Sequence, residues 1–500
     1  MHIKSSLAAA LALAGLTSGG ASHATNWVMA YGTEPATSTH RLQGAVQLTY
    51  ENNFDCRDTR GFVGGAKANN GRSVNNCRQG PELQDDESGL ALQNLMLGVR
   101  GNLIPNRINY HVAANAGQNA ANYHPYKTER EQLASLVNAS VSFHYIPGVR
   151  VRAGLQQKPG PEELYQGLEA TDYIFLTDFV QRVQIERFID GNAKSTNAIP
   201  GQGYGWQGTK NAQGVGSGVG AITGNVSRWG YDTDVGRDWG VQFFDAFKRD
   251  KWTHTYSVMF GNGNGIHRGD NNSDKDLNLY LSSEYDLPGG KGPLKHGLKL
   301  YGYHQKGVRN FVIDPSGRQS QDFDRIRYGI GAKALGHLFG EDRGKHRLGF
   351  ELMFADGMIN YTPTANTADA PFGGLVQFAA EEGNKAKGIT LDYGYYLNKR
   401  WQFDVRYSRD DLLYEQANAN PAKQYWTSGD ERILKYTTLG VNYYFAPKTR
   451  LTFNYEFRNV EAPNPARNTD GTVNPNSTIN ANVVSGSVGD RFGLRLTHTF

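Results

Sequence analysis

The stretch Val149–Lys158, with the sequence VRVRAGLQQK, alternates apolar residues with arginine, glycine and glutamine. A period of two places successive side chains on opposite faces of a β-strand, so this strand has one apolar face and one cationic face. A water-soluble sandwich would turn the apolar set to a core and leave the arginines in bulk water. A transmembrane barrel would turn the apolar set to lipid and the arginines to a water-filled interior. The rest of the chain decides between these two folds.

The same alternation recurs to the end of the chain and predicts about sixteen strands, an even number as bacterial barrels require. The predicted strands are 41–51, 90–103, 109–117, 137–145, 149–158, 239–247, 253–260, 277–285, 298–305, 325–334, 347–355, 389–397, 401–407, 437–445, 450–457 and 491–500. Short connections take turns with long polar ones, such as 361–384 and 461–484. This asymmetry is typical of outer-membrane barrels. We therefore predict an all-β fold, a transmembrane antiparallel β-barrel.

Residues 1–24 have the features of a signal peptide: Lys4, a short apolar run from Leu7 to Leu16, and small residues before Thr25. The barrel domain is then expected over 25–500. No later stretch approaches 18 uninterrupted apolar residues, which excludes a helical membrane protein. The mean hydropathy of −0.57 is compatible with alternating strands. The expected location is the outer membrane of a Gram-negative bacterium, with its lipid as a partner.

Loss of Lys4 with the signal lowers the formal net charge from +4 to +3. So weak a bias gives no reason to expect a nucleic-acid partner. The two cysteines, Cys56 and Cys77, lie close together among loop-type residues and are the candidate pair for a disulfide in an exported protein. The sequence contains no haem-attachment motif and no zinc-type cysteine pattern, so no cofactor and no metal site are expected.

After Lys158 the alternation stops for about eighty residues, far beyond ordinary loop lengths. Within this segment, 159–236, Pro161–Leu168 is a candidate short helix with Glu162 and Glu163 in its first turn. A barrel can take such a segment into its interior, and we expect 159–236 to be a long third loop that folds inward. The turn before the opening strand is expected to contain three residues, Ile146–Gly148, with a left-handed Gly148.

Several stretches together resemble the phosphate-selective porin O and P family. They are LQNLMLGVRG (92–101), VRAGLQQKPGPEE (151–163), RDWGVQF (237–243), YSVMFGNG (256–263) and the closing GLRLTHTF. The resemblance implies a sixteen-stranded homotrimer whose third loop folds inward and whose basic residues line an anion path. The chain departs from the family at Gly160, where an apolar or aromatic residue is usual, and in its long insertion, 194–228.

Apolar parity turns more cations than carboxylates toward the interior. Arginine suits an anion path because its planar fork donates to phosphate or carboxylate and stays charged. The candidate anion-path residues are Arg100, Arg150, Arg152, Lys158, Arg182, Arg325, Arg327, Arg406 and Arg458. For each of them the alternative is a structural role, in which wall arginines pair with loop carboxylates and set the pore size and field without selecting phosphate. Arg182 lies within the loop, and its alternative is to anchor the loop to the wall.

The predicted function is passive diffusion of small anions, with phosphate or polyphosphate as the leading candidates. A general or differently selective porin is one alternative. A scaffold barrel that encloses a partner, such as an electron-transfer cytochrome, is another. No motif gathers Ser, His and a carboxylate, so no catalytic residue and no enzymatic activity are expected.

Overall fold

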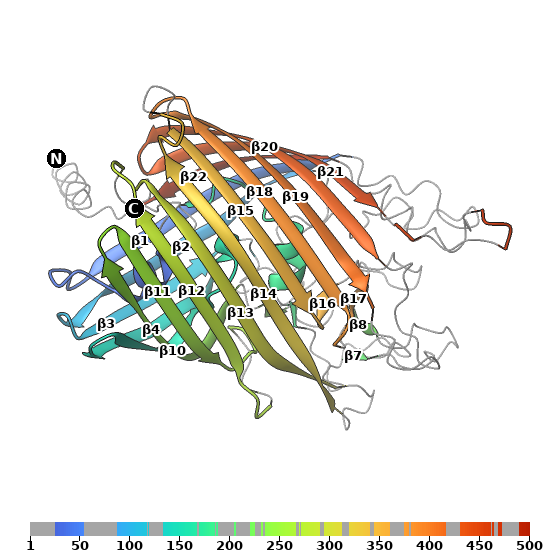
Figure 1. Ribbon diagram of the computed structural model, residues 1–500, viewed down its shortest axis with the longest axis horizontal. Helices are drawn as coiled ribbons and strands as arrows, with labels where there is room; N and C mark the ends of the chain where they lie inside the picture. The colour runs from blue at the N-terminus through green and yellow to red at the C-terminus, as the bar shows by residue number, and fades with distance from the viewer. Residues whose placement is uncertain are drawn as a thin grey trace, which may run out of the picture.

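The computed structural model describes residues 26–54, 88–117, 119, 134–167, 170–185, 187–188, 205–206, 221–225, 232–233, 236–266, 270, 272–290, 295–312, 320–340, 345–360, 375–379, 382–416, 431–461, 463–464, 469–472 and 490–500. These residues form a closed antiparallel barrel of sixteen strands (Figure 1). The strands are β1 (Arg41–Asn53), β2 (Ser88–Ile104), β3 (Ile108–Ala116), β4 (Ala134–Ile146), β5 (Val149–Gln157), β10 (Arg237–Arg249), β11 (Trp252–Gly261), β12 (Asp276–Asp286), β13 (Gly297–Val312), β14 (Ser320–Gly336), β15 (Lys345–Asp356), β18 (Lys385–Tyr396), β19 (Trp401–Glu415), β20 (Arg432–Ala446), β21 (Thr449–Glu461) and β22 (Arg491–Thr499).

Each predicted strand corresponds to one strand of this barrel, so the predicted fold class is confirmed. Closure is made by β1 and β22, which pair from Ala45 opposite Thr499 to Asn53 opposite Arg491. A closed barrel leaves no strand edge unpaired, as a lipid environment requires. The predicted signal peptide and the candidate disulfide of Cys56 and Cys77 lie outside the described residues.

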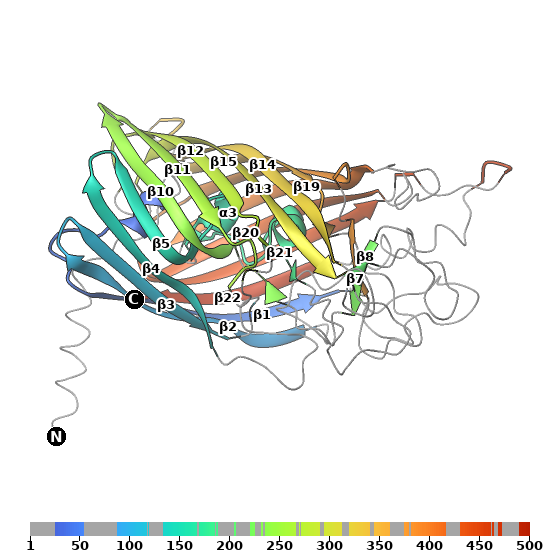
Figure 2. The same cartoon turned by 90° about the horizontal axis from the view of Figure 1, so that it is seen from below.

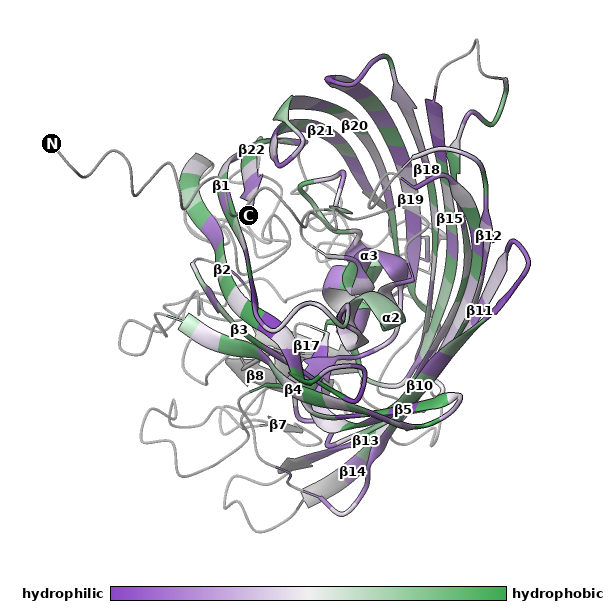
Figure 3. Cartoon of the chain, turned by 90° about the vertical axis from the view of Figure 1, so that its left-hand side faces the viewer, coloured by the Kyte–Doolittle hydropathy of each residue, from purple (hydrophilic) through white to green (hydrophobic). Residues whose placement is uncertain are grey.

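The outer face of the barrel is apolar. Leu42, Leu281 and Ile330 are 77%, 66% and 57% exposed, and green apolar bands cross the strands in Figure 3. Aromatic rings gather where the short turns are, with the Trp401 and Tyr443 centroids 4.6 Å apart and Phe445 packed edge-on against Tyr443. A lipid-facing band with aromatic residues at its border is characteristic of outer-membrane barrels. This architecture confirms the predicted location in an outer membrane. Among the described residues, no helix is long and apolar enough to cross a membrane.

The turn between β4 and β5 differs from the expected one. Ile146 pairs directly with Val149, so the turn has two residues, Pro147 and Gly148, and Gly148 has a positive φ of 79° as expected. The register shifts between Phe143 and Ile146. A β-bulge thus inserts the extra residue that restores the alternation, and the three-residue turn was wrong.

The long segment 159–236 begins and ends at one place on the wall. Gln157 pairs with Arg237, and the Lys158 N–H donates to the Gly236 carbonyl at 2.8 Å. Its first part contains the helix α3 (Glu162–Tyr165) and the π-helical turn η4 (Val180–Gln184), and Figure 3 shows α3 within the ring of strands. The helix α3 lies within the predicted helical range, Pro161–Leu168, but is shorter than that range.

Later parts of the same segment form small sheets away from the barrel wall. β8 (Ala221–Asn225) pairs with β17 (Leu375–Ala379), and β7 (Gly205–Trp206) pairs with β8. Figures 1 and 2 place β7 and β8 near the end of the barrel opposite the C-terminus. Only the first part of 159–236 is therefore seen inside the barrel, and most of the remainder lies outside the described residues.

A second element inside the ring of strands is the helix α2 (Trp27–Gly32), which the sequence analysis did not predict. Asn26 is its N-cap, with a side-chain oxygen that accepts from the Met29 N–H. We call 26–40 the N-terminal segment and 159–185, described except for 168 and 169, the inward segment. Both lie against the inner wall and define the candidate site.

Candidate functional site in the barrel interior

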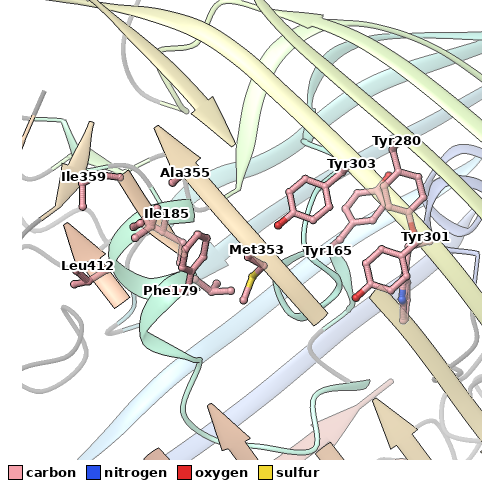
Figure 4. Packing of buried hydrophobic residues seen from close by; sticks show 14 of the residues in the cluster. Tyr165, Phe179, Ile185, Tyr280, Tyr301, Tyr303, Met353, Ala355, Ile359 and Leu412 are labelled. Atoms are coloured by element: carbon pink, nitrogen blue, oxygen red, sulfur yellow. The ribbon is translucent and has the colours of Figure 1, made fainter. Parts of the chain in front are cut away.

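An apolar cluster fixes the inward segment against the wall. Phe179, Val180 and Val183 are 0–1% exposed and pack in one cluster with Tyr303 and Met353 of the wall (Figure 4). Apolar burial of this kind is unusual for the interior of a wide barrel, which is otherwise polar. It holds the segment at a fixed place in the lumen.

Wall arginines bind backbone carbonyls of the inward segment. Arg327 donates to the Val183 carbonyl at 2.9 Å and Arg406 to the Phe175 carbonyl at 2.7 Å. A segment without regular secondary structure leaves carbonyl groups unpaired, and burial without partners would be costly. These cations supply the missing donors.

Carboxylates of the segment pair with further wall cations. Glu162 lies 2.9 Å from Lys299, with both side chains almost completely buried. Glu163 lies 2.5 Å from Arg406. The indole N–H of Trp27 also donates to Glu162 at 2.9 Å, which links the N-terminal segment to the inward segment.

Arg347 is the centre of a charge network between the inward segment and the wall. Its guanidinium lies 3.3 Å from Asp172 of the inward segment and 2.8 Å from Asp404 on β19, and it also pairs with Asp392 on β18. Gln402 donates to both Asp172 and Asp404 at 2.9 and 2.8 Å. The network joins the segment to three neighbouring strands.

The N-terminal segment is bound by two more wall arginines. Arg152 donates to the Val28 carbonyl at 3.1 Å and lies over the ring of Phe244, 4.6 Å from its centroid. Arg100 pairs with Glu34 and donates to the carbonyls of Ala30 and Thr33. Arginines of β2 and β5 thus fix the segment where it meets the wall.

The candidate anion-path residues fall into three groups. Arg150 keeps partial exposure and lies 3.2 Å from Asp245. The side chain of Arg182 lies outside what the structure describes. The other seven are 0–7% exposed, and they are Arg100, Arg152, Lys158, Arg325, Arg327, Arg406 and Arg458. Arg100 and Arg406 pair with carboxylates of the two segments, and Arg152, Arg325 and Arg327 donate to backbone carbonyls of the segments.

Two cavities adjoin these segments. One, of about 930 Å³, lies at the short-turn end of the barrel and is lined by Thr33, Glu34, Pro35 and Ala36 together with residues of the β2–β3 and β4–β5 turns, among them Arg107 and Arg150. The other, of about 50 Å³, lies between the inward segment and the wall. Its charged lining residues have both signs: Lys333, Arg347, Arg406, Glu163, Asp172, Glu351 and Asp392.

Two tyrosines of the inward segment have raised pKa values. Burial raises the pKa of Tyr165 to about 12. Burial likewise raises the pKa of Tyr173, against the opposing effect of Arg347. Desolvation disfavours the phenolate in both cases. Among the described residues, no group of three or more His, Cys, Asp and Glu side chains is placed to hold a metal ion.

Glu34 and Asp172, which pair with wall arginines, were not predicted from the sequence. Neither belongs to a periodic pattern, so no signal assigns them an orientation. The one available signal for the N-terminal segment is Asn26, a preferred N-cap residue directly before Trp27 and Val28. A six-residue helix is too short to show a recognisable hydrophobic periodicity in the sequence.

Solved structures of other proteins are similar in fold to this chain. No family model matches the sequence, and no curated protein matches it. OmpF of Salmonella typhi is 12% identical with a TM-score of 0.46, over 94% of this chain and 100% of that chain. An anion-selective porin from Comamonas acidovorans is 13% identical with a TM-score of 0.43, over 93% and 100%. The outer-membrane channel DcaP of Acinetobacter baumannii is 9% identical with a TM-score of 0.44, over 94% and 99%. The resemblance to the phosphate-selective family therefore rests on the short stretches quoted above.

Proposed function

We propose that this chain is an outer-membrane porin for the passive diffusion of small anions, with phosphate or polyphosphate as the preferred solute. The observation that carries the proposal is the placement of arginine and lysine on the inner face of a closed sixteen-strand barrel. Buried cations come from β2, β5, β13, β14, β15 and each strand from β19 to β22. Barrels of this size leave an aqueous channel, and basic walls favour anions.

The mechanism follows from where the charges lie. The cations raise the potential along the wall and so concentrate anions in the lumen. Arg150 and Arg107 line the larger cavity at the short-turn end, where a phosphate can exchange part of its hydration for guanidinium donors. The carboxylates of the inward segment offset part of this potential, which keeps binding weak enough for release. No catalysis forms part of the proposal.

Two alternative functions, a general porin and a scaffold barrel, receive less support. A general porin would need the same barrel, and the cation excess on the wall strands is what favours the anion-selective form. A scaffold that encloses a partner needs an empty lumen, whereas α2 and the inward segment lie against the wall in the described part of the interior.

We also propose that the protein is a homotrimer, on the resemblance alone. Sedimentation or light scattering of the detergent-solubilised protein measures the number of subunits.

The test is the zero-current potential of the purified protein in a planar bilayer under a potassium chloride gradient, followed by titration with phosphate. We expect anion selectivity and a chloride current that low phosphate blocks. Arg150→Gln should weaken the selectivity and the phosphate block. Lys248→Gln, a change of the same charge at a side chain that is 68% exposed, is the matched control. Selectivity for potassium would overturn the proposal, and a chloride current indifferent to phosphate would remove phosphate from it.

A further inference from the structure

Glu34 lies between two wall arginines, Arg41 and Arg100. Its side chain is 2% exposed. Oε1 accepts from Arg100 Nε and lies 3.4 Å from Arg41 Nη2. Carboxylate and phosphate oxygens are recognised by arginine in the same way, through charge-assisted hydrogen bonds to the guanidinium fork.

This internal pairing is incomplete. Among the residues that the structure describes, neither Glu34 Oε2 nor Arg41 Nε has a hydrogen-bond partner, although both atoms are buried. A buried acceptor and a buried donor that remain unmatched both cost free energy. A phosphate carries more oxygens than a carboxylate and can match both guanidinium groups at once. The arginine pair therefore offers a donor, Arg41 Nε, that the Glu34 carboxylate leaves unused.

The Glu34 site is connected to the larger cavity. Glu34 and its neighbours Thr33 and Pro35 form one side of the 930 Å³ cavity, and Arg107 and Arg150 lie on its lining as well. A ligand in this cavity reaches the carboxylate side of the pair. It meets Arg107 and Arg150 before it meets Arg41 and Arg100.

Next to Glu34, the N-terminal segment is bound to β2 through carbonyl groups, whereas Trp27 and Val28 are buried in the apolar cluster. Asn102 donates to the carbonyls of Pro35 and Ser38, each at 2.7 Å, and Arg100 donates to that of Thr33 at 3.1 Å. Such bonds can be exchanged for water one at a time. The pairing of β2 with β1 and β3 does not involve the residues around Glu34, so loss of these bonds leaves the strand pairing intact.

From these observations we propose that Arg41 and Arg100 form an oxyanion-binding site and that Glu34 is its internal competitor. A permeating phosphate displaces the Glu34 carboxylate and takes its place on the two guanidinium groups. The N-terminal segment then moves away from β2 at this point and opens the short-turn end of the path. This inference rests on the proposed function, since it names a binding site along the same anion path.

The experiment compares the wild-type protein with Glu34→Gln in single-channel recordings. Glutamine keeps the size of the side chain and removes the competing charge. We expect a higher chloride conductance, and a phosphate concentration for half-block that is lower by about tenfold, the effect of losing one charge-assisted competitor. Glu461→Gln is the matched control, because it removes the same charge from a half-exposed pair with Lys435 at the other end of the barrel. Resistance to detergent unfolding checks that each variant forms a barrel.

The outcomes separate the two proposals. Equal chloride conductance and equal half-block concentrations in the wild-type protein and Glu34→Gln would overturn the role of Glu34, even if both proteins are anion-selective. A potassium-selective wild-type protein would overturn the proposed function. A second variant, Glu34→Asp, retains the charge on a shorter side chain and should give a half-block concentration between the other two. A value for Glu34→Asp equal to that of Glu34→Gln would contradict competition by charge.

Discussion

Arg347 on β15 lies 3.3 Å from Asp172 of the inward segment, and both side chains are almost completely buried. The same guanidinium lies 2.8 Å from Asp404 on β19. Asp172 is in turn 3.8 Å from Arg450 on β21. The Asp172 carboxylate is thus shared between Arg347 on β15 and Arg450 on β21. The position of the segment and the charge of the wall cannot be changed independently.

The first prediction concerns Arg347→Gln. Removal of Arg347 leaves Asp404 buried without the cation that it pairs with and leaves Asp172 with the more distant Arg450. Loss of one partner of a buried ion pair typically lowers the free energy of unfolding by about 3–5 kcal/mol. Urea unfolding of the protein in lipid vesicles, followed by tryptophan fluorescence, measures the loss. The inward segment should also become accessible to protease at lower urea concentrations than the strands.

A surface pair provides the control for Arg347. Lys385 pairs with Glu415, and their side chains are 35% and 54% exposed. Because exposed ion pairs contribute about 0–1 kcal/mol, Lys385→Gln should leave stability nearly unchanged. Similar losses in the two variants would contradict the assignment of Arg347 as the anchor of the segment.

The second prediction concerns Gly32, the last residue of α2. A Cβ atom at this position would overlap with the guanidinium of Arg152 and the ring of Phe244. Gly32→Ala should therefore push the N-terminal segment from the wall, at a cost of about 1–3 kcal/mol for overpacking. The measurement is chloride conductance, which should rise. Gly302→Ala is the control, because its Cβ would meet its nearest atoms at an ordinary 3.5 Å, and a rise in conductance there too would refute the explanation.

The strands could be predicted because the pattern that identifies them is local. Leu279, Leu281 and Tyr285 of β12 alternate with inward Asn278, Ser282 and Glu284, and this period of two depends on nothing outside the strand. The same parity correctly assigned Arg327 and Arg406 to the interior. At Phe143–Ile146 a bulge altered the register, and the sequence offered no sign of it because a bulge and a longer turn restore the same parity.

The contacts inside the barrel could not be predicted in this way. Whether Arg406 faces water or the Phe175 carbonyl depends on the path of a segment far away in sequence. That path is set by the apolar cluster around Phe179 and by pairs such as Asp172–Arg347, none of which has a period. Residue type alone therefore indicated a cationic interior. It did not indicate which of the cations contact anions and which hold the inward segment.

The third prediction tests the outer face. Leu281 lies in the middle of β12 and is 66% exposed, whereas Leu42 lies at the start of β1 and is 77% exposed. An arginine costs about 2–4 kcal/mol at the bilayer midplane and about 0–1 kcal/mol near the interface. Leu281→Arg should therefore make folding into lipid vesicles less favourable by a much larger free energy than Leu42→Arg. Equal effects would contradict the assignment of this face to lipid.

The fourth prediction is a pH dependence that comes from Tyr165. Burial raises the pKa of its phenol from 10.0 in a free side chain to about 12. Between these two values the unfolded chain has lost the proton and the folded protein retains it, so stability is complete below pH 10 and falls as the pH rises toward 12. The contribution is at most about 2–3 kcal/mol for two pKa units. Tyr165→Phe should remove this part of the alkaline loss, measured as the free energy of unfolding below pH 10 and close to pH 12. Tyr145→Phe, at a side chain that is 54% exposed, should leave the alkaline loss unchanged. If Tyr165→Phe lost as much stability as the wild-type protein over this interval, Tyr165 would not be buried against the wall as the structure has it.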